Sequence, residues 1–413
     1  MKSKEEKMDR RMFLKTTGMA SASLAVTAGL AGKVPTAESA NNNYSKKMPT
    51  RILGKTGISV SILSLGGGVD WTINQSLLKM SANMGINYWD TAHDYINGKS
   101  ELGIGKYFEK YPEDRKKIFI ATKAEATEPK GLTEQLNTSF ERLKTDYIDL
   151  YGLHMADKPE ILTPEIKAWA EQKKKEGKIR FFGFSCHANM SLMLKHASNL
   201  GWIDSITSSY NFNLMNDNDI KKGIDACSRA GIGLVAMKSQ GLFFDKSSYN
   251  PLGAVKDEDL VITESFMAKG YTLQQAKLKA VWTDERITTC LSEISNLTIL
   301  KDNVAAATDN VQLSDSDMDM LNRFSQSNRS LYCKGCMRCE SVMASESRIN
   351  DILRYLMYYN SYGERDEARR LFRELPEEIK RNIALKDYSP AEHACPHNIR
   401  IGKAMREAAG LLG

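Results

Sequence analysis

The sequence predicts an α/β fold, a (β/α)8 TIM barrel followed by a small, mainly helical domain. From about residue 49 onward, eight short apolar runs alternate with amphipathic stretches of helical length, and a group of cysteines follows the last of them. Such alternation is typical of βαβ units with a parallel sheet, and eight units are what a closed barrel needs. The 413 residues exceed the roughly 250 of such a barrel, so further segments are expected at both ends.

The predicted strands are apolar runs bounded by glycine or polar turns. They are Ser61–Leu65, Ile86–Thr91, Ile118–Lys123, Ile148–His154, Ile179–Ser185, Ser205–Tyr210, Ile232–Lys238 and Ile287–Leu291. The predicted helices are Gln75–Met84, Ser100–Lys110, Leu132–Leu143, Pro164–Glu176, Met190–Leu200, Asp217–Ala230 and Thr272–Trp282. An open, doubly wound sheet is the alternative. No Gly-x-Gly-x-x-Gly follows the first strand, however, and Gly66-Gly67-Gly68 lacks that fingerprint.

The N-terminus reads as a targeting segment rather than as part of the fold. Arg10-Arg11 precede Met-Phe-Leu-Lys, a weakly apolar stretch follows over Thr16–Gly32, and small residues lie near Ala37–Ala40. This order describes a signal peptide, and the paired arginines resemble a twin-arginine signal. We therefore expect a signal over residues 1–40, a linker over 41–48 and export to the periplasm or beyond. A basic, alanine-rich helix of a cytoplasmic protein is the alternative.

The charge distribution argues against nucleic acid as a partner. The formal net charge is +6, of which the first 40 residues supply +3 through seven Lys/Arg against four Asp/Glu. The remainder shows no dense basic stripe with interleaved aromatic residues. We also expect no membrane span in the mature chain, because the apolar stretch before Gly32 is too weakly apolar to cross a bilayer comfortably.

Four polar residues lie at or just after the ends of three consecutive predicted strands. Asp90 ends the second strand, Tyr95 follows it, Lys123 ends the third and His154 ends the fourth. Because the chemistry of such barrels takes place at the C-terminal ends of the strands, we expect these side chains to form one site. Each alone is weak evidence, but their joint occurrence is much harder to obtain by chance.

The stretch Asp90-Thr91-Ala92-His93-Asp94-Tyr95, followed by Gly98-Lys99-Ser100-Glu101, resembles the aldo-keto reductase family, and the resemblance extends over residues 49–325. It implies that Tyr95 is the general acid. Lys123 as a cation would then favour the phenolate, Asp90 would hold Lys123, and His154 would orient the carbonyl or share the proton transfer. The implied substrate is a small carbonyl or alcohol compound.

The resemblance also implies a nicotinamide cofactor, NADP or NAD. The residues that would hold it are Ser185, Tyr210 (stacked on the nicotinamide), Lys238, Ser239, Gly241 and Asn303. Cys186 and Thr207 stand where many members have Asn and Gln. Glu293 and Ile299 stand where basic residues usually bind a 2′-phosphate, so NADH is as plausible a reductant as NADPH.

The C-terminal segment, residues 326–413, contains a ferredoxin-like set of cysteines. Cys333, Cys336 and Cys339 are spaced Cys-x2-Cys-x2-Cys, and Cys395 precedes a proline. One triplet and one distant Cys-Pro supply four thiolates, enough for one [4Fe-4S] cluster, and the segment resembles the ferredoxin-like tail of some aldo-keto reductases. Zinc and disulfides are the alternatives. The span Ile349–Arg381 reads as helices packed around the cluster.

These features predict an exported oxidoreductase that carries one cluster. Twin-arginine export transports folded proteins, so the signal and a cytoplasmically assembled cluster agree with each other. A cluster passes single electrons whereas nicotinamide exchanges hydride, and no flavin signature connects the two. The cluster is therefore expected to be structural or to face a redox partner protein. An iron–sulfur electron-transfer or binding protein that uses the barrel as a scaffold is the alternative function.

Overall fold

The computed structural model describes residues 47–240, 257–343, 347–362 and 364–413. Contacts divide the chain into two compact units, Met1–Asn43 and Tyr44–Gly413. The predicted signal over residues 1–40 and most of the predicted linker lie outside the described residues, as does Gly241. Within the described ranges, no helix is both long enough and apolar enough to cross a membrane.

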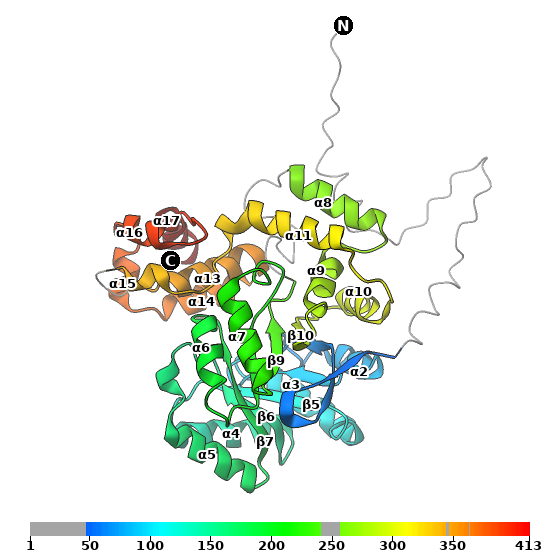
Figure 1. Cartoon of the computed structure of the whole chain (residues 1–413). Helices are drawn as coiled ribbons and strands as arrows, with labels where there is room; N and C mark the ends of the chain where they lie inside the picture. The colour runs from blue at the N-terminus through cyan, green and yellow to red at the C-terminus, as the bar shows by residue number, and fades with distance from the viewer. Residues whose placement is uncertain (1–46, 241–256, 344–346, 363) are drawn as a thin grey trace, which may run out of the picture. The chain divides into compact units, whose positions relative to one another are not determined.

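The eight predicted strands form a closed parallel barrel, which excludes the open doubly wound sheet. The barrel closes where the last strand pairs with the first, with Cys290 opposite Leu63. The strands are β3 (Leu63–Leu65), β4 (Tyr88–Asp90), β5 (Phe119–Ala124), β6 (Ile148–Leu153), β7 (Ile179–Cys186), β8 (Ser205–Ser209), β9 (Gly233–Met237) and β10 (Ile287–Ser292). Figure 1 labels β5, β6, β7, β9 and β10 among them.

All seven predicted helices are present in the barrel. They are α2 (Gln75–Asn83), α3 (Lys99–Lys110), α4 (Pro129–Leu143), α5 (Pro164–Lys175), α6 (Met190–Ala197), α7 (Asn218–Arg229) and α9 (Leu273–Trp282). The sequence analysis missed α8 (Asp257–Ala268), α10 (Leu297–Thr308), α11 (Asp315–Asn328) and the 3-10 turns η3 (Gly54–Thr56), η4 (Pro112–Asp114) and η5 (Pro159–Ile161). Helix α11 continues past residue 325, where the barrel was predicted to end.

A β-hairpin that was not predicted packs at the N-terminal ends of the barrel strands. Its strands are β1 (Thr50–Ile52) and β2 (Ser59–Ser61). The guanidinium of Arg51 donates to the carbonyl oxygens of Trp282 and Ile287, at 2.6 Å each, where β10 begins. The hairpin therefore lies at the end of the barrel opposite to the C-terminal strand ends, where the candidate site was expected.

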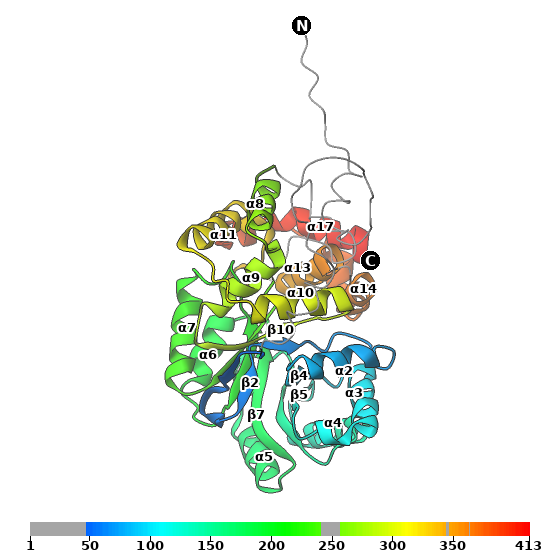
Figure 2. The ribbon, with the colours of Figure 1, turned by 90° about the vertical axis from the view of Figure 1, so that its right-hand side faces the viewer.

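The C-terminal segment is helical, as predicted, and has an apolar core of its own. Buried residues of this core include Ile349, Phe372, Met405 and Leu412. Its elements are η6 (Arg329–Leu331), α12 (Arg338–Ser341), α13 (Ile349–Met357), the π-helix η7 (Tyr358–Tyr362), α14 (Arg365–Arg373), α15 (Glu377–Asn382), α16 (Ser389–Ala394) and α17 (Ile401–Leu412). Figure 2 shows α13, α14 and α17 gathered beyond α10.

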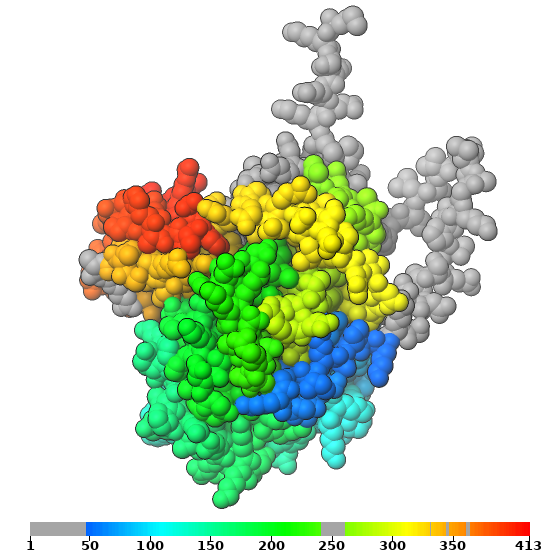
Figure 3. Space-filling model, in the orientation of Figure 1, coloured from blue at the N-terminus to red at the C-terminus, as the bar shows by residue number. Residues whose placement is uncertain are grey.

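The cysteine-containing loop of this segment is bonded to loops at the C-terminal ends of β7 and β8. The backbone N–H of Asn189 donates to the carbonyl oxygen of Gly335 at 2.7 Å, and Lys334 forms an ion pair with Asp217. Gly335 has φ +69°, and a Cβ there would lie 2.5 Å from the carbonyl oxygen of His187. Only glycine therefore allows this approach. In the space-filling view the orange and red C-terminal residues abut green residues of the barrel (Figure 3).

Candidate functional site

The four residues predicted to act together lie at one end of the barrel. Asp90 is the last residue of β4, Lys123 is the next to last residue of β5 and His154 directly follows β6. Tyr95 lies in the loop between β4 and α3. Because neighbouring parallel strands end at the same rim, the fold places all four side chains on one side of the barrel mouth.

Lys123 and Asp90 form a buried ion pair. The Nζ atom of Lys123 donates to Oδ1 of Asp90 and to the carbonyl oxygen of Thr91, at 2.6 Å each. The two side chains are only 6% and 2% exposed. Burial raises the pKa of Asp90, and the positive charge of Lys123 acts in the opposite direction. The pair fixes the ammonium group beneath the loop that carries Tyr95.

Tyr95 lies between Lys123 and His154. The Nζ atom of Lys123 is 5.0 Å from the centre of the Tyr95 ring, and the rings of Tyr95 and His154 meet edge to face at 5.3 Å. Burial raises the pKa of Tyr95 well above its usual value, and Asp90 and Asp94 add to the increase. The predicted easing of proton loss by Lys123 stays a prediction, because burial and the two carboxylates act in the opposite direction.

Asp94 is a member of the site that the sequence analysis quoted but assigned no role. Its Oδ1 atom lies 3.1 Å from Nδ1 of His154, whose side chain is 5% exposed. Burial acts to raise the pKa of Asp94, but the contact with His154 more than offsets it and the net pKa is lowered. With Glu125 the two form a set of possible metal ligands whose donor atoms lie within 4.8 Å of one another. In the sequence, only the position of Asp94 directly before Tyr95 indicated that Asp94 could belong to the site.

Two of the predicted cofactor residues, Ser239 and Asn303, lie close together where β9 and β10 end. The hydroxyl of Ser239 donates to the carbonyl oxygen of Leu291 at 3.2 Å. The amide of Asn303 donates to the hydroxyl of Ser292 at 2.8 Å and accepts from Gln240 at 3.2 Å. Hydroxyl and amide groups of this kind suit the polar groups of a dinucleotide. The predicted contact of Gly241 falls outside the described residues.

Ser185 and Lys238 occupy different surroundings from this group. Ser185, in β7, accepts a hydrogen bond at 3.0 Å from the backbone N–H of Met155, the residue after His154. Ser185 therefore adjoins the four-residue site, as a ligand of the reacting end of a cofactor would. The Nζ atom of Lys238 lies 2.9 Å from Nδ1 of His187, so this side chain is directed toward β7 and the C-terminal segment.

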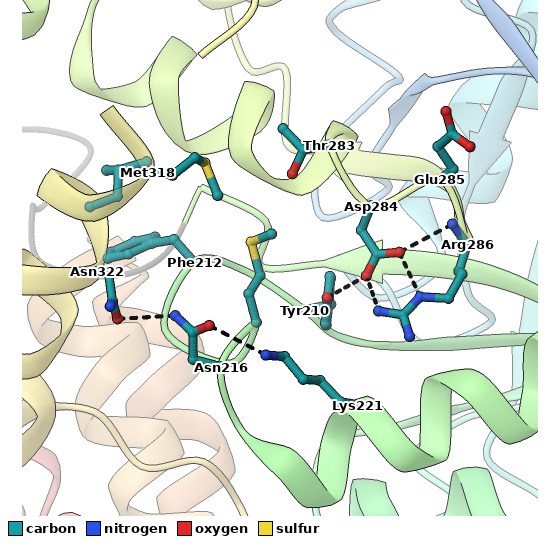
Figure 4. A pocket seen from close by; sticks show the side chains of 12 residues that line it. Tyr210, Phe212, Asn216, Lys221, Thr283, Asp284, Glu285, Arg286, Met318 and Asn322 are labelled. Atoms are coloured by element: carbon teal, nitrogen blue, oxygen red, sulfur yellow. Dashed lines mark hydrogen bonds and ion pairs between the residues drawn. The ribbon is translucent and has the colours of Figure 1, made fainter. Parts of the chain in front are cut away.

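Tyr210 lies in a cavity of its own. Its hydroxyl donates to Asp284 at 2.6 Å, and Asp284 is paired with Arg286 (Figure 4). The cavity measures about 530 Å³ and is also lined by Phe212, but by none of Asp90, Tyr95, Lys123 or His154. Figure 4 shows the Tyr210 hydroxyl directed at Asp284. The predicted stacking of Tyr210 on a nicotinamide therefore remains a prediction, and the hydroxyl already has a partner.

Residues of the C-terminal segment reach the site, which the sequence analysis did not foresee. The Nη1 atom of Arg354 lies 3.4 Å from Sδ of Met155, 199 positions away in the sequence. Tyr358 and Glu364, from the same segment, contribute to the raised pKa of Tyr95, after burial and the two aspartates. No local pattern relates α13 and η7 to the strand ends, so sequence reasoning had no signal for these contacts.

The four C-terminal cysteines lie near one another. Burial raises the pKa of Cys333 and of Cys339 to about 12. Cys336 and Cys395 lie close enough to raise both values further. The backbone N–H of Gly335 points at the sulfur of Cys333, 3.4 Å away. Cys339 is buried and the other three are partly buried, and neighbouring thiols become stable as thiolates when a positive centre binds them.

The spacing of these sulfur atoms bears on the zinc and disulfide alternatives. All seven cysteines have free thiols. Tetrahedral zinc holds its four sulfur atoms roughly 3.8 Å apart, given Zn–S bonds of about 2.3 Å. Among the described residues, the cysteines do not provide three sulfur atoms within 4.8 Å of one another. No disulfide joins these thiols in the structure, and the choice between zinc and a cluster stays a prediction.

Comparisons with known proteins agree with the barrel fold and show the family. The profile of the aldo/keto reductase family matches residues 64–326. An aldo-keto reductase of Fusarium vanettenii is 28% identical over 230 residues, covering 45% of this chain and 62% of that protein. The uncharacterized oxidoreductase YqkF of Bacillus subtilis is 34% identical over 153 residues, covering 33% of this chain and 49% of that protein. The chain thus spans less than two thirds of these curated relatives.

Among solved structures, the holo form of aldo-keto reductase AKR11C1 from Bacillus halodurans superposes with a TM-score of 0.58 at 25% identity. The match covers 67% of this chain and 96% of that one. The thermostable aldo-keto reductase Tm1743 superposes with a TM-score of 0.56 at 24% identity, a likeness of fold.

Proposed function

Because this chain belongs to the aldo/keto reductase family, we propose that it is an NAD(P)-dependent oxidoreductase that interconverts a carbonyl compound and an alcohol. The observation that carries the proposal is the buried Lys123–Asp90 pair beneath Tyr95, with His154 at the ring edge. This is a proton donor held between a fixed cation and an imidazole, which is the arrangement that carbonyl reduction requires.

In this proposal Tyr95 donates the proton of its Oη atom to the carbonyl oxygen of the substrate. A bound nicotinamide would supply the hydride. The raised pKa of Tyr95 keeps the proton in place until charge develops on the substrate oxygen. Lys123 then stabilises the phenolate that remains, and Asp90 keeps the ammonium in position. His154, whose Nδ1 lies 3.1 Å from Oδ1 of Asp94, would orient the carbonyl or share the proton transfer.

Ser185, Ser239 and Asn303 are the residues we propose to hold the cofactor. Ser185 adjoins His154 through Met155, whereas Ser239 and Asn303 lie together at the ends of β9 and β10. Lys238 is directed away from this pair. Either NADP or NAD suits this set. By the resemblance, Glu293 stands where a basic residue usually binds the 2′-phosphate of NADP. A carboxylate there would repel the phosphate, which favours NAD.

The direct test is turnover of the purified full-length protein. We expect it to bind NADH or NADPH and to oxidise the nicotinamide stoichiometrically when an aldehyde or dicarbonyl compound is added, as measured by absorbance in a single turnover. The same cofactor titration without a carbonyl compound is the control. A protein that neither binds nicotinamide nor reduces any carbonyl compound would favour the alternative in which the barrel is a scaffold.

We further propose that Cys333, Cys336, Cys339 and Cys395 bind one [4Fe-4S] cluster. The Cys-x2-Cys-x2-Cys and Cys-Pro pattern and the nearness of the four thiols to one another support it. A cluster would pass single electrons, and the chain has no group that converts these into hydride. A structural role, or one toward a redox partner protein, therefore suits it better than a role in the reaction itself.

Export by the twin-arginine route is also proposed. Arg10-Arg11 precede a weakly apolar segment, and this route carries folded, cofactor-loaded proteins. We expect replacing Arg10 and Arg11 together by Lys to retain the protein in the cytoplasm, as measured by fractionation of cells. Replacing Lys2 and Lys4 by Arg is a matched control that should leave export intact. Unchanged export of the Arg10→Lys, Arg11→Lys protein would contradict the twin-arginine assignment.

A further inference from the structure

A small cavity of about 60 Å³ lies between the C-terminal ends of the barrel strands and the C-terminal segment. Its polar lining includes three cationic side chains, Lys238 from the barrel and Lys334 and Arg354 from the segment. The other polar residues that line it are His187, Ser209, Tyr332, Cys333 and Asn350. Lys334 is paired with Asp217. Arg354 is paired with Asp351, whereas Lys238 forms no ion pair among the described residues.

Arg354 projects from α13 and has a donor to spare. Its side chain is 11% exposed, and Nη2 donates to Asp351 at 2.9 Å. Nη1 reaches the sulfur of Met155, a weak acceptor. Its Nε atom is buried and has no hydrogen-bond partner. Arg354 also interacts with the hydroxyl of Tyr358, so Nε is the nitrogen that lacks any partner. A guanidinium can bind a carboxylate through two parallel hydrogen bonds.

Lys238 is an enclosed ammonium without a neighbouring acid in contact. Nζ lies 2.9 Å from Nδ1 of His187 and 5.4 Å from the centre of the Tyr358 ring. Among the described residues, no carboxylate forms an ion pair with it. Asp157, which acts on it from a distance, already accepts from the backbone N–H groups of His187 and Ala188. Burial and the charge of Arg354 lower the pKa of Lys238 to about 7.

None of Asp90, Tyr95, Lys123 and His154 lines this cavity, but Arg354 and Tyr358 connect it to them. Arg354 contacts Met155, which directly follows His154. Tyr358 interacts with Arg354, lies under the ammonium of Lys238 and acts electrostatically on Tyr95. The C-terminal segment thus brings an arginine from α13 to the same side of the barrel mouth as the proton donor, and Lys238 meets it from the end of β9.

We propose that Arg354 and Lys238 bind a carboxylate of the substrate, so that the substrates are carbonyl compounds with a carboxylate next to the carbonyl, the 2-oxo acids, and the corresponding 2-hydroxy acids. This inference rests on the proposed carbonyl reduction at Tyr95. A cavity of about 60 Å³ suits a group of carboxylate size. The bound carboxylate supplies a negative charge opposite the two cations. It also holds the adjacent carbonyl group in an orientation that faces His154 and Tyr95.

The test compares a matched pair of substrates, phenylglyoxylate and its methyl ester, which differ by one negative charge. Their kcat/KM values are measured for the parent and for Arg354→Met and Lys238→Met, all in the full-length, cofactor-loaded protein. Charge-assisted hydrogen bonds contribute enough that we expect the acid-to-ester ratio to fall about 10- to 100-fold in Arg354→Met, chiefly through KM for the acid. Arg354→Lys should retain part of the preference.

Arg373→Met is the control, because it removes an equal charge from the exposed side of the same C-terminal segment. It should leave the ratio unchanged. An unaltered ratio in both Arg354→Met and Lys238→Met would overturn the proposal. So would a changed midpoint potential of the cluster with an unaltered ratio, because the two cations would then serve the cluster next to Cys333. If the parent reduces neither compound nor any other carbonyl, the proposed function itself fails.

Discussion

Tyr95→Phe should slow single-turnover hydride transfer to a carbonyl substrate by roughly 10²–10⁴-fold, the usual contribution of general acid–base catalysis. The substitution removes one oxygen and retains the ring, so its edge-to-face contact with His154 and the position of the Lys123 ammonium over its face should persist. Nicotinamide affinity should therefore change little. Stopped-flow absorbance of the bound cofactor measures the rate, and equilibrium titration measures the affinity.

Lys123→Met should act on the same step. It removes the charge that stabilises the phenolate once the proton has left, and it leaves Asp90 as a buried carboxylate without its cation. Because residues that act as a unit are not additive, the double variant should be scarcely slower than the slower single variant. His154 variants should lose less if this residue only orients the substrate.

Tyr151→Phe is the matched control for the loss of a phenolic oxygen. Tyr151 is fully buried in β6, and its hydroxyl makes one long hydrogen bond, 3.4 Å, to the carbonyl oxygen of Leu132. This change should leave hydride transfer nearly unaltered. If Tyr95→Phe reduces carbonyls as fast as the parent, Tyr95 is not the acid and the family likeness describes the fold alone.

Cys336→Ser should abolish the [4Fe-4S] cluster. The parent made anaerobically should contain about four iron and four acid-labile sulfide per chain, because four thiolates complete one such cluster. The variant should lose iron, sulfide and the corresponding EPR signal after reduction. Cys333 and Cys339, with pKa values raised to about 12, would then remain as buried protonated thiols.

Cys227→Ser is the control for this experiment. Cys227 lies in α7, and its sulfur is 3.1 Å from the carbonyl oxygen of Leu194, a contact that a serine hydroxyl can also make. The iron content of the Cys227→Ser protein should equal that of the parent. Stoichiometric zinc without iron or sulfide in the anaerobically made parent would contradict the cluster. Loss of iron from both variants alike would show that instability, rather than loss of a ligand, explains the result.

The sequence by itself determined the barrel and most of the four-residue site. Apolar runs of strand length separated by amphipathic stretches can bury their apolar faces in few ways, and all eight strands and seven helices appear where this pattern predicts them. Asp90, Lys123 and His154 follow from the same rule, because the ends of parallel strands meet at one rim. The hairpin β1–β2 was missed because each strand has only three residues and carries no clear alternation.

Only the tertiary structure decided which groups surround that site. The hydroxyl of Tyr210 is held by Asp284, and Lys238 faces His187 rather than the pair of Ser239 and Asn303, because loop geometry rather than strand periodicity directs these side chains. Arg354 reaches Met155 across 199 positions of sequence, through a contact that depends on how two separate apolar cores pack together. Periodicity fixes which face of an element is buried, but the partner of a polar side chain on a loop is fixed only when distant segments meet.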